Sequence, residues 1–306
     1  MVEQTKTTIK IASDCSGVGT DAFAAAELGL TFRSVFASEI DASCRQVLRN
    51  HCDRPERILK AAGIGDKVSH DIDLYTVGMP CQPYSSAGKR QGRLDKRCLD
   101  AYKKFIKTIK DAKLKAKPSV PAYRLKTFVL NSLSFGLAQH RERVYILGVR
   151  QRASGLKRPL PKNPTPKISK KPELAKFLRP LTVSPGDRQL KSKTAKKNFR
   201  WASKTYTGAS EAVVDCGAGK EFRQVREGAT PTITRARGAS RSVFLLKERR
   251  YLTLHELELL QGFKKINWPK GIPKTKRGAM IGNATSVPVL AAAMRAVLVA
   301  GGLLKK

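Results

Sequence analysis

The sequence predicts an α/β fold with a mostly parallel sheet and a smaller, basic domain that follows it. A strand, a glycine turn and a helix open the chain, and two more strand-like segments follow within the first 80 residues. Residues 151–200 then hold 15 Lys or Arg against 2 acidic residues, with seven prolines. A length of 306 residues with 41% hydrophobic content suits one large core with a smaller appendage.

The N-terminal segment has the pattern of a mononucleotide-binding unit. Residues 8–13 (TIKIAS) predict a buried strand, DCSGVGT predicts a glycine turn, and residues 21–30 predict a helix. A second strand over 31–38 ends at Glu39, 22 residues after Gly17, and a helix over 41–50 follows. An acid at this position binds a ribose hydroxyl in such folds.

A third apolar segment, residues 73–80, ends at Cys81. Active groups of parallel sheets gather at the carboxyl ends of strands, which draws attention to this cysteine. Farther on, Phe105, Ile106 and Ile109 stand at helical spacing among lysines and predict an amphipathic helix with a basic outer face. Two strand-like segments, 123–131 and 143–149, are expected to form an antiparallel pair at the sheet's edge.

The charge balance favours a polyanionic partner. The chain has 60 Lys or Arg and 24 Asp or Glu, a formal charge of +36, and each cation placed on a phosphate releases a counterion. Nucleic acid is therefore the first expectation and an anionic membrane surface the second. The run KSKTAKKNFR (191–200) suits a solvated loop, a DNA contact or a nuclear-localisation signal.

Features that the sequence lacks give expectations about where the protein is located and whether it binds a metal. Without a long apolar run or a secretory signal, we expect a soluble intracellular protein with no membrane partner, in a nucleus or in a bacterial cytoplasm and nucleoid. Six scattered cysteines without a CxxC pair predict free thiols and no metal site. Nothing in the sequence indicates the oligomeric state.

Five motifs in order resemble those of the cytosine-5 DNA methyltransferases. In chain order they are DCSGVGT together with ASEID, GMPCQPYSSAGK around Cys81, QHRER (139–143), RYLTLHELELLQGF (250–263) and IGNATSVPV (281–289). The resemblance implies a Rossmann-like methyltransferase sheet. It also implies a catalytic domain over 1–150, a basic target-recognition region over 151–249, and a segment over 250–306 that returns to the catalytic domain.

The resemblance implies an enzyme that methylates carbon 5 of cytosine in DNA. The thiolate of Cys81 would add to carbon 6 of a flipped cytosine and make carbon 5 nucleophilic. Arg143 would hold the carbonyl oxygen of the base, with Arg141 as the second candidate. Gln82, Ser85 and Ser86 would belong to the loop that closes on the flipped base.

The resemblance also implies S-adenosyl-L-methionine as the cofactor. The glycine turn faces its methionine part, Glu39 faces its ribose, and an acid contacts the adenine amine, either Asp66 or Asp71. Ile40, next to Glu39, is a further expected cofactor residue. Cys15 stands where the family commonly has a phenylalanine, so adenine stacking is expected to be weaker. The other expected cofactor residues are Ser16, Gly17, Val18 and Gly19 of the turn, Gly78 at the strand-end edge of the pocket and Asn283 at its far wall.

The end of the basic region offers candidate DNA contacts. Arg235, Arg237 and Arg241 lie in ATPTITRARGASRS. They are expected to contact phosphates or guanine edges, and phosphate contact is the first expectation because most protein–DNA hydrogen bonds are of that kind.

One departure from the family pattern bears on activity. The family carries Glu-Asn-Val on a central strand between the motifs of Cys81 and Gln139, and this interval contains no glutamate here. Loss of an acid–base group costs about 10²- to 10⁴-fold in rate, so a slow or inactive enzyme is expected. A DNA-binding pseudoenzyme is therefore the alternative, while a missing exon or flawed gene model explains the gap equally well. A tRNA methyltransferase ranks lower because the Cys-Phe-Thr signature of that branch is absent.

Overall fold

The computed structural model describes residues 8–60, 72–78, 105–115, 117–152, 158–166, 172–179, 185–190, 192–208 and 211–305. The chain divides into two compact units. The first comprises Met1–Val129, Val144–Pro164 and Leu290–Lys306, and the second comprises Leu130–Arg143 and Thr165–Val289. The predicted division at 150 and 249 follows function and stays a prediction. Residues 250–289 group with the second unit here, and 290–306 with the first.

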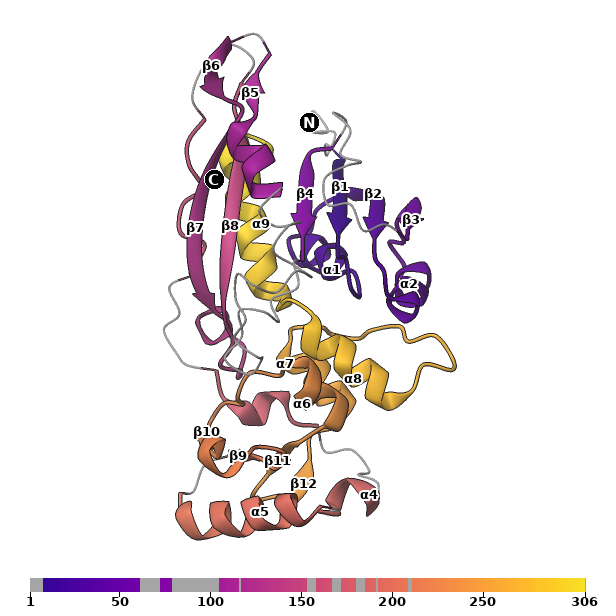
Figure 1. Ribbon diagram of the computed structural model, residues 1–306, viewed down its shortest axis with the longest axis vertical. Helices are drawn as coiled ribbons and strands as arrows, with labels where there is room; N and C mark the ends of the chain where they lie inside the picture. The colour runs from indigo at the N-terminus through magenta and orange to yellow at the C-terminus, as the bar shows by residue number, and fades with distance from the viewer. Residues whose placement is uncertain are drawn as a thin grey trace, which may run out of the picture. The chain divides into compact units, whose positions relative to one another are not determined.

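A parallel four-stranded sheet forms the centre of the first unit, as predicted. Its strands are β1 (Ile9–Asp14), β2 (Phe32–Ser38), β3 (Arg57–Leu59) and β4 (Leu74–Val77), in the order β3-β2-β1-β4 (Figure 1). All three strand pairs are parallel. The short strand β3 was not predicted, because three residues are too few to show a period of two.

Two helices connect the parallel strands at the predicted places. Helix α1 spans Thr20–Glu27 and α2 spans Ala42–Arg49. Asp41 caps α2 by accepting hydrogen bonds from the backbone N–H groups of Ser43 and Cys44. The carboxyl ends of β1 and β2 therefore lead directly into turns and helix starts, where this fold class places its ligand.

Residues 105–150 form small separate elements. A helix over 105–111 confirms part of the predicted amphipathic helix. Strands β5 (Lys113–Leu114) and β6 (Lys117–Pro121) pair antiparallel, and β7 (Tyr123–Asn131) pairs with β8 (Glu142–Arg150). The pairing of β7 with β8 confirms the predicted pair. The predicted place at the edge of the parallel sheet was wrong, because among the described residues β7 and β8 hydrogen-bond only to each other and form a separate two-stranded sheet.

The second unit is more regular than a loop-rich module. Strands β9 (Ala212–Asp215), β10 (Val225–Glu227), β11 (Val243–Leu245) and β12 (Arg250–Tyr251) form an antiparallel sheet in the order β10-β9-β11-β12. Helix α5 (Lys193–Thr205) covers it through a core of Ala195, Ala202, Val214, Cys216 and Phe244. The interpretation of 151–200 as a linker or loop-rich module was therefore wrong for α5, whose apolar positions are small alanines among many lysines.

The remaining helices complete the second unit and the C-terminus. They are η3 (Ser132–Phe135), η4 (Leu174–Phe177), α4 (Pro185–Arg188), η5 (Lys220–Phe222), α6 (Arg235–Ser240), α7 (Leu254–Leu260), α8 (Lys274–Asn283) and α9 (Val287–Gly301). Helices α6 and α8 approach so closely that a Cβ on Gly238 would lie 2.0 Å from the carbonyl oxygen of Gly278. Glycine is therefore required at this crossing.

Residues 274–301 have the length and apolar composition of a membrane-crossing helix. They form two helices, α8 and α9, separated at 284–286, and half of the apolar window is buried inside the protein. A core helix of a soluble protein meets the same criteria, so this stretch is weak evidence for a membrane span.

Candidate functional site

The turn after β1 adopts backbone conformations that need its glycines. Gly17 and Gly19 have φ values of 57° and 77°, in the left-handed region. The hydroxyl of Ser16 lies within hydrogen-bond distance of the carbonyl oxygens of Ser13 (3.1 Å) and Ser38 (3.2 Å). Val18 is buried at 1% exposure and anchors the turn. The turn is thus held rigidly between the ends of β1 and β2.

Glu39, directly after β2, faces the glycine turn. Its carboxylate accepts a hydrogen bond from the backbone N–H of Gly17 at 2.8 Å and another from that of Asp41 at 2.9 Å, one on each oxygen. A carboxylate oxygen accepts more than one hydrogen bond, so both oxygens keep capacity for ligand hydroxyls. The next side chain, Ile40, is 71% exposed and offers an apolar surface beside this acid.

Gly78 ends β4 against the same turn. Its N–H donates to the carbonyl oxygen of Asp14 at 3.1 Å, and a Cβ here would lie 2.8 Å from the carbonyl oxygen of Cys15. Only glycine permits this approach of two backbones. The structure therefore brings Ser16, Gly17, Glu39 and Gly78 to one end of the parallel sheet, as the sequence predicted.

Asp14 is a residue of this region that the sequence analysis did not select. It is 4% exposed and accepts hydrogen bonds from the hydroxyls of Ser38 and Tyr75. The three residues belong to β1, β2 and β4, so the carboxylate at the carboxyl end of β1 joins three strands of the sheet. An acid at the last position of a buried strand was the available signal.

The proposed catalytic loop lies outside the described residues. This holds for Cys81, Gln82, Ser85 and Ser86, and for both adenine candidates, Asp66 and Asp71. The structure therefore leaves their roles as predictions.

Two buried glutamines join the three later motifs within the second unit. The side chain of Gln139 donates to the carbonyl oxygen of Leu260 at 2.9 Å and accepts from the N–H of Ile233 at 2.9 Å. Gln261 donates to the carbonyl oxygens of Ile281 (2.8 Å) and Ala284 (3.1 Å). The two amides meet at 3.0 Å. Buried side-chain amides must be satisfied, so this network fixes 139–143, 250–263 and 281–289 in one arrangement.

The two arginines of QHRER have different surroundings. Arg141 is 6% exposed and donates to the carbonyl oxygens of Ile233 (2.8 Å), Gly282 (3.3 Å) and Ala284 (2.8 Å). Arg143 is half-buried and donates to the adjacent carbonyl oxygen of Glu142 at 2.6 Å. Arg141 therefore holds the backbone of neighbouring motifs, whereas Arg143 is the better candidate for a ligand contact.

The motif RYLTLHELELLQGF contains a buried ion pair. Arg250 donates to both carboxylate oxygens of Glu256, at 2.8 and 2.9 Å, and Glu256 is fully buried. Burial raises the pKa of Glu256, but hydrogen bonds from Arg250 and from the N–H groups of Thr253 and Arg179 outweigh it and hold this pKa below its usual value. Glu256 also forms a capping box with Thr253 that starts α7.

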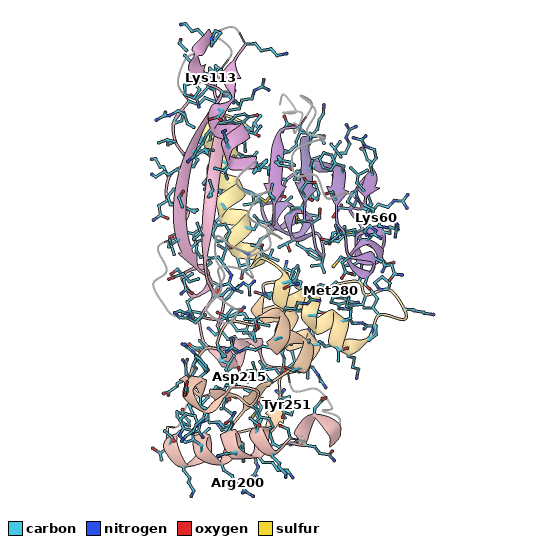
Figure 2. All side chains as sticks on the ribbon, in the orientation of Figure 1. Lys60, Lys113, Arg200, Asp215, Tyr251 and Met280 are labelled. Carbon is cyan, nitrogen blue, oxygen red and sulfur yellow. The ribbon has the colours of Figure 1, made fainter. Side chains whose placement is uncertain are left out.

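The candidate DNA-contacting arginines are only partly available. Arg237 forms an ion pair with Asp215 at 2.5 Å and donates to the carbonyl oxygen of Thr232 at 2.9 Å (Figure 2 labels Asp215). Arg241 pairs with Asp187 at 2.6 Å, while Arg235 is exposed. DNA contact by these residues stays a prediction.

Asn283, the predicted far wall of the cofactor pocket, is the exposed last residue of α8. It belongs to the second unit, whereas the glycine turn and Glu39 belong to the first. Its contact with a cofactor therefore stays a prediction.

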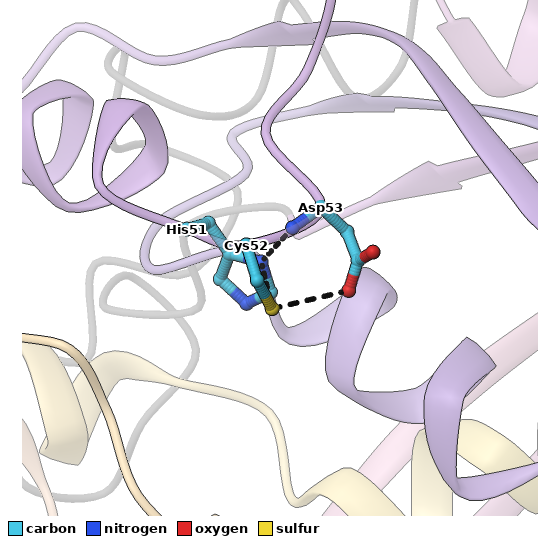
Figure 3. A group of neighbouring side chains, drawn as sticks. All are labelled: His51, Cys52 and Asp53. Atoms are coloured by element: carbon cyan, nitrogen blue, oxygen red, sulfur yellow. Dashed lines mark hydrogen bonds between the residues drawn. The ribbon is translucent and has the colours of Figure 1, made fainter.

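His51, Cys52 and Asp53 bring three potential metal ligands within 4.8 Å of one another (Figure 3). Local hydrogen bonds account for the cluster: the N–H of Asp53 donates to Nδ1 of His51 at 3.2 Å, and the thiol of Cys52 donates to the Asp53 carboxylate at 3.3 Å. Burial and the neighbouring carboxylate raise the pKa of Cys52, which disfavours the thiolate that a metal needs. We therefore interpret it as a turn.

Comparison with known proteins identifies relatives along nearly the whole chain. The family profile described as C-5 cytosine-specific DNA methylase matches residues 9–120 and 117–298. The chain is 28% identical over 284 residues to the type II methyltransferase M.HaeII of Haemophilus aegyptius, covering 85% of this chain and 84% of that protein. It is 33% identical over 157 residues to the type II methyltransferase M.NgoBI of Neisseria gonorrhoeae, covering 44% and 48%.

Other matches cover less of the relative. The orphan methyltransferase M.Rho11sI of Bacillus phage rho11s is 26% identical over 229 residues, which cover 65% of this chain and 42% of that protein. The chain thus spans under half the length of several relatives. Among solved structures, a DNMT2 mutant of Spodoptera frugiperda matches with a TM-score of 0.62 and 16% identity, covering 95% of this chain and 100% of that one. The methyltransferase EhMeth of Entamoeba histolytica matches with a TM-score of 0.63 and 16% identity, covering 95% and 98%. At this identity the two structures support the fold alone.

Proposed function

Because the chain belongs to the C-5 cytosine-specific DNA methylase family, we propose that it transfers a methyl group from S-adenosyl-L-methionine to carbon 5 of cytosine in DNA. The observation that carries the proposal is the family match over 9–298 together with Cys81 in its Pro-Cys-Gln setting. The match to M.HaeII over most of both chains supports the same activity.

The cofactor end of the first unit fits S-adenosyl-L-methionine. We assign the ribose hydroxyls to the Glu39 carboxylate, which the turn already orients through the N–H groups of Gly17 and Asp41. The exposed Ile40 supplies an apolar contact for the adenine, and the close backbone approach at Gly78 bounds the site. When bound, the cofactor supplies an electrophilic methyl group. The residues described here bind and orient it.

The chemistry itself is assigned to the Cys81 loop and to Arg143. The Cys81 thiolate would form a bond to carbon 6 of the flipped cytosine, and the displaced ring electrons would let carbon 5 attack the methyl group, whose bond to the cofactor sulfur breaks so that the cofactor leaves as a neutral thioether. A base then removes the proton from carbon 5, and the Cys81 sulfur leaves as thiolate, which restores the ring. We assign to Arg143 the contact with the carbonyl oxygen of the base.

A catalytically impaired DNA-binding protein of the same fold is the second candidate. The two family-matched segments, 9–120 and 117–298, overlap at residues 117–120, so no unmatched residues lie between them. A chain that lacks a piece of the family sequence gives this result, and the junction falls where the Glu-Asn-Val strand is missing from the sequence. Within the described residues, no strand pairs with β4 on the side away from β1.

Methyl transfer from labelled S-adenosyl-L-methionine to unmethylated duplex DNA tests both candidates. Three further proteins accompany the chain: Cys81→Ala, the exposed-cysteine control Cys52→Ala, and the chain with a restored Glu-Asn-Val segment. Transfer that is lost only in Cys81→Ala supports the enzyme. Transfer only after restoration supports the impaired protein, and transfer to tRNA in place of DNA contradicts the proposed substrate.

A further inference from the structure

The outer face of α5 is a basic stripe. The helix, KTAKKNFRWASKT, has five cationic residues and no acidic one. At 100° per residue, all five side chains start within about 100° of the helix circumference. All five are exposed, and Figure 2 labels Arg200 among them. We call this set the α5 stripe; its members are Lys193, Lys196, Lys197, Arg200 and Lys204.

The opposite face of α5 is fixed to the sheet. Ala195 and Ala202 are buried in the core of the second unit, and Phe199 packs edge-on against Phe244 with ring centroids 5.3 Å apart. The side chain of Asn198 donates to the carbonyl oxygen of Ala218 at 2.8 Å and to that of Cys216 at 3.2 Å. The helix therefore cannot turn the stripe inward, and its charges must face a partner or solvent.

Acidic side chains in the described part of the chain do not neutralise the stripe. The described ion pairs include none of its five members. Two arginines extend the positive surface beside it: Arg223 lies over the Trp201 ring at 4.8 Å and Arg249 over the Phe199 ring at 5.2 Å. The local excess of positive charge requires a polyanion or counterions to balance it.

We propose that the α5 stripe binds the phosphate backbone of duplex DNA without reading its sequence. From Lys193 to Lys204 the helix rises about 16 Å. That length corresponds to about five phosphates of one strand along the axis of a B-form duplex. Four of the five cations are lysines, which act as flexible point charges and suit phosphates better than base edges. The proposal takes duplex DNA as the partner from the proposed function, but it does not require methyl transfer.

An anionic membrane fits this surface less well. A helix that lies in a membrane interface buries an apolar face among the lipids. The apolar face of α5 is already buried in the protein core, and Phe199 and Trp201 are both partly covered. Phosphate contact without insertion is the interaction that the exposed face allows.

The test is DNA binding at several salt concentrations, measured by fluorescence anisotropy of a labelled duplex without S-adenosyl-L-methionine. In the variant, all five stripe residues are replaced by Gln, which keeps the helix propensity. The slope of log K against log salt is negative, and each lost phosphate contact reduces its magnitude by about 0.9. We expect the magnitude to fall by at least about 2 in the Gln variant, and a variant that carries Arg at the four lysine positions to keep the wild-type slope.

The matched control replaces five exposed lysines of the first unit by Gln, and circular dichroism checks the fold of each protein. The control residues are Lys107, Lys110, Lys113, Lys115 and Lys117. An unchanged slope in the stripe variant, or an equal fall in the control, overturns the proposal. A loss confined to tRNA or to phosphatidylserine vesicles, with duplex binding unchanged, overturns it as well. Because DNA binding is measured without cofactor, the experiment tests the proposed role of the α5 stripe even if the chain transfers no methyl group.

Discussion

Replacing each arginine of QHRER by glutamine separates a structural role from a ligand contact. Arg141→Gln removes the donor from three backbone carbonyl oxygens. The oxygen of Ala284 keeps the hydrogen bond from Gln261, so the oxygens of Ile233 and Gly282 are the two that lose a donor. An unsatisfied buried acceptor costs about 1–3 kcal/mol, which gives a loss of about 2–6 kcal/mol in the free energy of unfolding.

Arg143→Gln is the matched control for stability. Its guanidinium is half-buried and bonds the carbonyl oxygen of Glu142. Changes at such positions alter the free energy of unfolding by about 0.5 kcal/mol or less. If Arg143 holds the base, its loss instead removes a charged hydrogen bond worth about 1.5–3 kcal/mol, or about 10- to 150-fold in methyl transfer.

Thermal unfolding measures the loss of stability in each variant, and a methyl-transfer assay measures the loss of activity. For a domain of this size, each kcal/mol lost from the free energy of unfolding lowers the thermal midpoint by about 2–4 °C. A loss near 4 kcal/mol in Arg141→Gln therefore lowers the midpoint by about 8–16 °C. Transfer is measured in whichever form of the chain is active, as it stands or with Glu-Asn-Val restored. An unchanged midpoint in Arg141→Gln, or an equal fall in Arg143→Gln, refutes the division of roles.

Three further predictions concern the packing of each unit. Glu256→Gln breaks a buried ion pair and should destabilise the protein by about 3–5 kcal/mol. Folding lowers the pKa of Glu256, so the stability that its carboxylate contributes is present above the ordinary pKa and is lost as the pH falls through the folded pKa. The thermal midpoints of wild type and variant should therefore converge in acid. Burial raises the pKa of Asp21, so the ionised carboxylate is disfavoured in the folded state. Asp21→Asn should therefore raise the thermal midpoint at pH 7, and this gain should shrink as the pH falls through the raised pKa. A lower midpoint of the variant at pH 7 would contradict the prediction. Gly78→Ala places a Cβ 2.8 Å from the carbonyl oxygen of Cys15. It should lower the free energy of unfolding by about 1–3 kcal/mol and weaken S-adenosyl-L-methionine binding, measured by calorimetry. In the control Gly301→Ala the added Cβ meets nothing within 4 Å, so neither quantity should change.

The parallel half of the fold was predictable because its signals are local. Buried strands, a turn with two left-handed glycines and the acid that follows β2 each occupy a few consecutive positions. The position of Glu39 against the turn also follows from the order of parallel strands, since β1 and β2 end at the same edge. Helix α5 was missed because its buried positions are small alanines, and the lysines between them dominate the composition.

The roles of the later motifs depended on contacts distant in sequence. Gln139 and Gln261 are 122 positions apart, and Arg141 bonds residues 92 to 143 positions away. No local pattern distinguishes Arg141, whose guanidinium donates to backbone carbonyl oxygens, from Arg143, two positions later.

Sequence by itself determined the family, the parallel sheet and the position of Glu39 against the glycine turn. Tertiary structure decided which polar side chains are used inside the protein, because burial forces each of them to find partners that only folding brings near.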